Sequence, residues 1–287
     1  MMKSITCSAP VTSVGGAIEK TRKTGTRRSV FEFRHKIGFG GRLGLGISAW
    51  IVFLGVWQLI SALELADPTL FPSPAKVFEA WITLFAEKEF AADVLQSLKR
   101  IFLSFGIAVA IALPLGILMG AFTPVEGFLN ALASPFRYLP APSFVPLLLM
   151  WLGTGDSQKI ALLVIGVVFF LITLFMDNTK SVPVDLVECA RTLGAGRMMV
   201  LRKILLPAAM PLYVDTARQM LAVSWTYLVI AEIVATTDGI GAMMMRAKRF
   251  VQVDNIMAGI LTIGLLGLIS DLLIRMIHKR LFKYLNE

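Results

Sequence analysis

The stretch from Val187 to Pro211 reads VECARTLGAGRMMVLRKILLPAAMP. Pro183, just before it, can open a short helix, and Asp185 and Glu188 place negative charge in its first turns, as the helix dipole favours. Gly194 then allows a tight turn. A second helix follows, with basic residues for a solvated side (Arg197, Arg202, Lys203) and apolar residues for contact (Met198, Met199, Leu201, Leu205). The stretch therefore predicts two short helices that protrude from the rest of the fold.

The sequence on both sides of this stretch is strongly apolar. The 287 residues are 56% hydrophobic and only 16% charged, against about 25% charged residues in soluble domains. Apolar runs close to the roughly 17–25 residues that cross a bilayer as a helix recur along the chain. We therefore expect an all-α integral membrane protein. Six spans are predicted: 43–63, 101–125, 128–152, 160–176, 213–236 and 256–277.

Two of the segments have unusual patterns. The third predicted span contains Arg137 and four prolines, so it should be kinked or partly unwound. The polar stretch 64–100 has a helical apolar pattern and is expected to lie on the membrane surface as an amphipathic segment.

The distribution of Lys and Arg predicts the orientation, because cytoplasmic loops carry the excess. The 1–42 tail, the 177–208 loop and the C-terminal end hold seventeen, and the other connections hold eight. Both termini and the 177–208 loop are therefore placed in the cytoplasm. Cys7 and Cys189 should stay reduced there, without a disulfide.

The net charge of +9 could suggest nucleic acid, but the basic residues separate apolar runs and form no basic, aromatic-interleaved face. Membrane topology accounts for the charge, and no nucleic-acid partner is expected. The basic tail, residues 1–42, is expected to be disordered, uncleaved and cytoplasmic; an organellar transit peptide is the alternative.

The 177–208 segment resembles the EAA loop of binding-protein-dependent ABC importer permeases. That loop reads E-A-A, three residues, G, nine residues, I, one residue, L-P. The matching positions keep every spacing, and Cys189 in place of alanine is the one departure: Glu188, Cys189, Ala190, Gly194, Ile204, Leu206 and Pro207. An ordinary amphipathic cytoplasmic hairpin is the alternative interpretation.

The resemblance implies that these residues couple the membrane helices to an ABC ATPase subunit, and that residues 43–287 form a type I importer transmembrane domain. The chain has no G-x-x-x-x-G-K-[ST] phosphate-binding loop. ATP and Mg²⁺ are therefore expected on the partner ATPase. Zinc-type Cys/His spacing is also lacking, so neither a cofactor nor enzymatic activity is expected in this chain.

Three further stretches narrow the resemblance to one branch. Residues 70–77 (LFPSPAKV), 137–156 (RYLPAPSFVPLLLMWLGTGD) and 225–241 (WTYLVIAEIVATTDGIG) look like the permeases of nitrate, sulfonate, taurine and bicarbonate importers. A small oxyanion is therefore the expected solute. Members of the branch also carry riboflavin or pyrimidine precursors, so a non-anionic metabolite remains the alternative.

Two arginines are candidates for the translocation path. Arg137 and Arg218 are each expected about 15 Å beyond the cytoplasmic boundary, at about 1.5 Å per residue. A guanidinium at that depth faces a cavity or a partner. Arg218 has Asp215 three residues before it, so a structural ion pair is the competing interpretation. Arg137 has no acidic neighbour in sequence.

Three residues of the fifth predicted span are further candidates. Glu232, near the outer side, could be a gate element or an interfacial carboxylate. Trp225 and Tyr227 could close a narrow path, although packing or interfacial anchoring is the commoner role of aromatic residues in membrane helices.

The leading hypothesis is a multi-pass inner-membrane permease that forms a homodimer, contacts membrane lipid, and works with two ATPase subunits and an extracytoplasmic substrate-binding protein. A secondary transporter would need inverted repeats with paired broken helices, and no repeat between the halves is evident. A membrane scaffold or channel that uses the 177–208 loop only for docking is the third class.

Overall fold

The computed structural model describes residues 38–86, 88–234 and 237–283. The predicted tail therefore lies outside the described residues, apart from 38–42. The chain divides between Val52 and Phe53 into two units. Helix α1 (Phe39–Ala62) crosses this boundary, and its largely exposed apolar side chains agree with a membrane environment.

All other regular structure in the described residues is helical as well, which confirms the predicted fold class. The elements are α2 (Pro74–Ala86), α3 (Lys88–Ala121), α4 (Thr123–Phe136), η1 (Ala141–Phe144), α5 (Val145–Leu152), α6 (Asp156–Lys180), α7 (Val184–Thr192), α8 (Arg197–Val200), η2 (Leu201–Leu205), α9 (Leu206–Val234), α10 (Ile240–Arg249) and α11 (Val253–Leu281).

Four of the described helices are long and apolar enough to cross a membrane: residues 40–62, 89–121, 156–180 and 253–281. Helix α9 has the same length as α11, at 29 residues, but it carries Asp215, Arg218 and Glu232. The predicted third span is not one helix. It is divided into α4, a turn, η1 and α5 at its prolines, as expected from their missing N–H groups. The count of six spans remains a prediction.

The predicted boundary of the second span was wrong. Helix α3 begins at Lys88 rather than at Ile101, and it contains the polar residues Asp93, Ser97 and Arg100, all buried. Polar side chains are typical of a surface segment, but in the fold these three bond to residues of α9 and α10. Ser97 and Arg100 donate to Glu232, and Asp93 accepts from Arg246. Only α2 retains the predicted amphipathic character.

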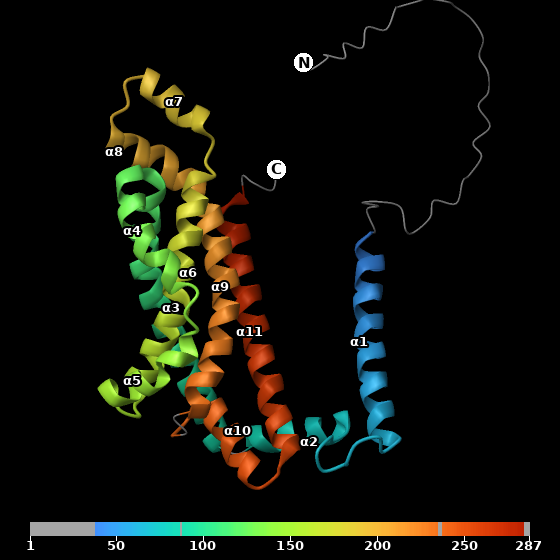
Figure 1. Ribbon diagram of the computed structural model, residues 1–287. Helices are drawn as coiled ribbons and strands as arrows, with labels where there is room; N and C mark the ends of the chain where they lie inside the picture. The colour runs from blue at the N-terminus through green and yellow to red at the C-terminus, as the bar shows by residue number, and fades with distance from the viewer. Residues whose placement is uncertain (1–37, 87, 235–236, 284–287) are drawn as a thin grey trace, which may run out of the picture. The chain divides into compact units, whose positions relative to one another are not determined.

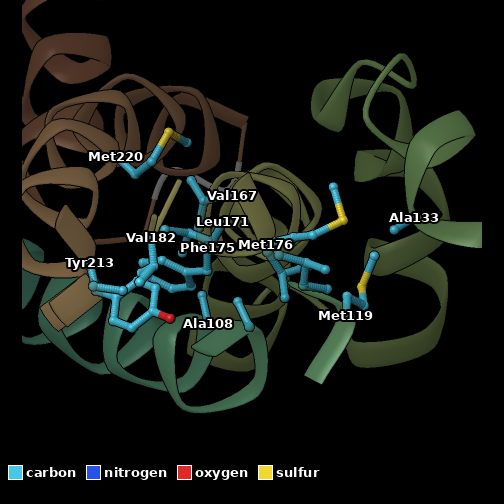
Figure 2. Close-up of a cluster of buried hydrophobic side chains, with 14 residues drawn as sticks. Ala108, Met119, Ala133, Val167, Leu171, Phe175, Met176, Val182, Tyr213 and Met220 are labelled. Carbon is cyan, nitrogen blue, oxygen red and sulfur yellow. The ribbon is translucent and has the colours of Figure 1, made fainter. Parts of the chain in front are cut away.

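Helix α6 lies at the centre of the bundle and packs along α3, α9, α4 and α5. Figure 2 shows the buried cluster around its middle, where Leu171, Phe175 and Met176 meet side chains of neighbouring helices such as Ala108 and Tyr213. Close approach to α3 requires small residues. A Cβ at Gly116 would lie 2.6 Å from the Phe175 Cβ, and one at Gly120 would lie 2.4 Å from the Thr179 Cβ.

The bundle has two distinct ends (Figure 1). Helices α7 and α8 extend from one end, and α2, α5 and α10 lie at the other. Helix α11 finishes at the α7–α8 end, because His278 Nε2 lies 3.2 Å from the carbonyl oxygen of Pro211 at the start of α9.

Candidate functional site

The predicted two-helix protrusion is present as α7 and α8, and the turn between them depends on Gly194. Its φ of +84° is in the left-handed region that favours glycine. The Gly194 N–H donates to Arg191 O and the Ala195 N–H donates to Ala190 O, each at 2.9 Å. This pair of bonds is the Schellman arrangement that ends a helix. The glycine of the EAA-like pattern is therefore favoured by backbone geometry.

The hairpin, meaning residues 183–205, exposes both charge and apolar surface. Within the hairpin, Glu188 and Cys189 are exposed, whereas Ala190 is buried. Leu193, at the turn, is 83% exposed. Exposed apolar side chains on a protruding element are typical of a protein interface. Further exposed apolar residues of the hairpin are Val184, Leu186, Met198 and Met199.

The hairpin joins the bundle without a break. Helix α8 passes through the π-helical turn η2, which contains Ile204, into α9, which begins with Leu206 and Pro207. Proline lacks an N–H, so regular α-helical bonding cannot continue through this region. Between the hairpin and the α3–α4 corner lies a pocket of about 560 Å³, lined in part by Arg191 and Arg197.

Arg137 caps the C-terminal end of α4, where the chain turns toward η1. Its Nε is buried without a hydrogen-bond partner, and no ion pair between described residues includes it. The guanidinium carbon lies 5.8 Å from the centre of the Tyr138 ring, within the range of a cation–π contact. Arg137 is thus a cation with unused hydrogen-bonding capacity.

Arg218 has the opposite environment. Its Nε and Nη2 donate to Asp215 Oδ1 at 3.0 and 2.7 Å, and its Nη1 donates to Asp271 of α11. Asp215, the partner expected from the sequence, is therefore joined by a second carboxylate, that of Asp271 on another helix. Asp271 also accepts from Arg275.

Both aromatic candidates pack against neighbouring helices. Trp225 is buried in a cluster with residues of α3 and α6, and its Nε1 has no acceptor. Tyr227 covers Gly166 of α6, where a Cβ would lie 2.8 Å from the ring. The arrangement agrees with a packing role for each.

Glu232 is 1% exposed and belongs to a buried polar cluster at the α10 end. Its Oε1 accepts from Ser97 Oγ at 2.7 Å and from Arg100 Nη1 at 2.9 Å, and its Oε2 accepts from the Gly241 N–H at 2.9 Å. A Cβ at Gly239 would lie 2.3 Å from Glu232 Oε1. Gly239 and Gly241 therefore let the backbone at the start of α10 approach this carboxylate.

Arg100 is the centre of the cluster. The sequence alone does not single it out as a site residue. Arg100 is 1% exposed, its Nε donates to Asp156 Oδ1 at 2.7 Å, and its Nη2 donates to Asp238 Oδ1 at 2.5 Å. Lys159 of α6, 0% exposed, donates to the same Asp238 oxygen at 3.1 Å and to Thr237 Oγ1 at 2.8 Å. Both cations are among the eight Lys and Arg residues that the charge count assigns to the outer connections.

The Asp238 carboxyl remains ionised in this environment. Burial alone would raise its pKa, but the hydrogen bonds from Thr237, Arg100 and Lys159 outweigh burial and hold the pKa well below its usual range. Asp93 closes the cluster on its other side, where it accepts from the Gly239 N–H at 2.7 Å and pairs with Arg246. The cluster thus joins α3, α6, α9 and α10. No group of three or more potential metal ligands occurs in the part of the chain that the structure describes.

The family model for the "binding-protein-dependent transport system inner membrane component" matches residues 112–283, which include the hairpin and Arg137. The chain is 32% identical to the taurine transport system permease protein TauC of Escherichia coli K12, over 85% of this chain and 90% of that protein. It is 28% identical to the putative aliphatic sulfonates transport permease protein SsuC of Bacillus subtilis 168, over 95% and 96%.

Solved structures show the same fold. The methionine ABC transporter MetNI, in inward-facing conformations, matches with a TM-score of 0.55 at 23% identity and covers 65% of this chain and 95% of its own. A bacterial alginate ABC transporter in complex with a periplasmic protein matches with a TM-score of 0.54 at 18% identity, over 84% and 95%. The chain is therefore a multi-pass membrane permease subunit of the binding-protein-dependent ABC importer family, in the taurine and sulfonate branch, and not the subunit that hydrolyses ATP.

Proposed function

We propose that this chain forms the translocation path for a small oxyanion, with sulfonates such as taurine as the first class to test. The observation that carries the proposal is the 32% identity over 85% of the chain to a taurine permease. Nitrate and bicarbonate belong to the same class of solute.

Arg137 supports an anionic solute. It lies in the proline-interrupted region between α4 and η1, with a buried Nε that no group accepts from. A guanidinium within a membrane domain is costly unless it faces a cavity or a partner. A passing oxyanion would supply transient acceptors for its planar donors. Arg218 is the weaker path candidate, because two carboxylates already engage it.

The hairpin is proposed as the contact with the ATPase, in which Glu188, Cys189 and the exposed Leu193 face the partner and Ala190, Gly194, Ile204, Leu206 and Pro207 maintain the hairpin's shape. Helix-in-groove docking uses such exposed apolar anchors. ATP and Mg²⁺ would be bound by that partner. The α7–α8 end, and with it the C-terminal end of α11, would then face the cytoplasm, as would the N-terminus by the charge count.

Two further partners complete the proposed assembly. A second copy of this permease would form the other half of the path, and a substrate-binding protein would deliver the solute at the α10 end. Residues 43–287 would form the transmembrane domain, with 1–42 as a cytoplasmic tail.

Uptake by the reconstituted importer tests the function. The permease, its ATPase and its binding protein would be placed in proteoliposomes, and ATP-dependent uptake of taurine, methanesulfonate, nitrate and bicarbonate would be compared with that of riboflavin. The proposal expects at least one of the anions to accumulate, only with ATP and the binding protein. Accumulation of riboflavin alone would overturn the anionic assignment, and uptake without the ATPase would indicate a secondary transporter.

A further inference from the structure

Two fully buried cations converge on a single carboxylate oxygen. Asp238 Oδ1 accepts from Arg100 Nη2 at 2.5 Å, from Lys159 Nζ at 3.1 Å and from Thr237 Oγ1 at 2.6 Å. A guanidinium, an ammonium and a hydroxyl around one anionic oxygen form the donor set that proteins use for oxyanions.

The two cations depend on Asp238 to different degrees. Without it, Arg100 would keep Asp156 and Glu232 as partners. Lys159 would keep no carboxylate, since Asp238 is its only ion-pair partner among the described residues. A buried ammonium without a counterion is strongly unfavourable. This position therefore requires an anion, whichever group supplies it.

Asp238, unlike the two cations, is accessible to solvent. Its side chain is 44% exposed, whereas those of Arg100 and Lys159 are 1% and 0% exposed. The cations are held on α3 and α6, two long helices packed closely together. An anion from solution that took the place of this carboxylate would leave the charge of the cluster unchanged, since one negative group replaces another. A neutral or cationic solute could not do so without leaving Lys159 unpaired.

We infer that Arg100 and Lys159 form an oxyanion-binding site at the α10 end of the permease, which Asp238 occupies in this structure and from which an anionic solute displaces it. This inference rests on the proposed function, because the solute that enters from this end must be an anion. The backbone carbonyl oxygen of Asp238 also accepts from Arg100 Nη1 at 3.0 Å.

The test is an anion titration of the purified permease–ATPase complex, read as the thermal unfolding midpoint. Sodium methanesulfonate is the probe, dimethyl sulfone its uncharged isostere, and sodium chloride at equal ionic strength controls for screening. Asp238→Asn removes the competing charge and keeps the side-chain shape. We expect methanesulfonate to bind Asp238→Asn with an apparent dissociation constant about tenfold lower than that of the wild type, since about 1.4 kcal/mol of competition would be lost. Dimethyl sulfone should have no effect on either.

The double variant Lys159→Gln/Asp238→Asn should lose this gain, because the ammonium is gone. Lys248→Gln is the matched control, since it removes one exposed cation from α10 and should leave the titration unchanged. If Asp238→Asn does not fold, Lys159→Gln and Lys159→Arg in the otherwise native chain serve instead. The first should raise the apparent dissociation constant and the second should preserve it.

Equal methanesulfonate affinity in the wild type and in folded Asp238→Asn would overturn the site, as would affinity retained by the double variant. The uptake assay distinguishes a failure of this binding site from a failure of the proposed function. If the reconstituted importer accumulates anions but the titration is flat, only this site is wrong. If it accumulates only uncharged solutes, the proposed function is wrong whatever the titration shows.

Discussion

Arg218 of α9 forms an ion pair with Asp271 of α11 and a second one with Asp215 on its own helix. The guanidinium therefore links two helices at the half of the bundle nearer the hairpin. Without the guanidinium, Asp215 would lose its counterion and Asp271 would keep only the more exposed Arg275.

This link predicts a structural phenotype for Arg218. Arg218→Gln should lower the thermal midpoint of the complex, and Arg218→Lys should lower it less, because the ammonium keeps a positive charge beside Asp215 and Asp271. Differential scanning fluorimetry and uptake measure the two properties separately. A folded Arg218→Gln complex with a normal midpoint and little uptake would instead place Arg218 on the path.

Gly194 predicts a conformational effect on ATPase coupling. Its Cβ position is open, so substitution acts through φ rather than through a clash. Gly194→Ala should cost about 1–2 kcal/mol in the left-handed region and weaken ATPase association about fivefold or more. Gly194→Asn is the matched control, because asparagine tolerates this region better. Co-purification and ATP-driven uptake are the readouts, and equal loss in both variants would contradict the conformational explanation.

Arg137 predicts a charge effect on transport. Lysine keeps the charge without the planar fork, whereas glutamine removes the charge. Arg137→Gln should reduce anion uptake about tenfold, a change of about 1.4 kcal/mol, and Arg137→Lys should reduce it less. Complex assembly and basal ATPase activity should persist in both. Normal uptake by Arg137→Gln would remove this residue from the path.

The close contact between α3 and α6 predicts which glycines tolerate a methyl group. Gly116→Ala would place its Cβ 2.6 Å from the Phe175 Cβ and 2.8 Å from the Ile172 carbonyl oxygen. It should cost about 1–3 kcal/mol of stability, as overpacking does. Gly106→Ala, on the same helix, meets nothing within 4 Å and should be neutral or stabilising. Thermal midpoints of the two variants give the comparison, and equal values would argue against helix packing at this distance.

The proposed orientation predicts which residues an impermeant thiol reagent reaches. In a chain with Cys7 replaced by serine, the exposed Cys189 should react only after the membrane is opened. With Cys189 also replaced, Phe250→Cys should react from outside, because Phe250 is exposed at the turn between α10 and α11. Labelling of Cys189 in intact cells would invert the orientation and remove the argument for ATPase contact.

The hairpin could be predicted because its determinants are local. Gly194 and Pro207 mark a turn and an interrupted helix by backbone chemistry alone, and the structure has Gly194 at positive φ. The break in the predicted third span follows from its prolines in the same way. Neither required knowledge of distant contacts.

The polar cluster could not be predicted for the opposite reason. Arg100 bonds to Asp156, Glu232 and Asp238, which are 56, 132 and 138 residues away. Polarity near Arg100 therefore suggested a surface loop, and α3 was predicted to start too late. The one available signal was that Arg100 and Lys159 each adjoin long apolar runs, where a lone charge needs a partner.

The central position of α6 has a mechanical consequence. Asp156 and Lys159 lie in its first turns and Lys180 ends it just before the hairpin, so 25 residues give a single lever about 37 Å long at about 1.5 Å per residue. If α6 pivoted by about 5° about its hairpin end, its opposite end would move by about 3 Å, close to one hydrogen-bond length. A displacement of that size would separate Lys159 from Asp238.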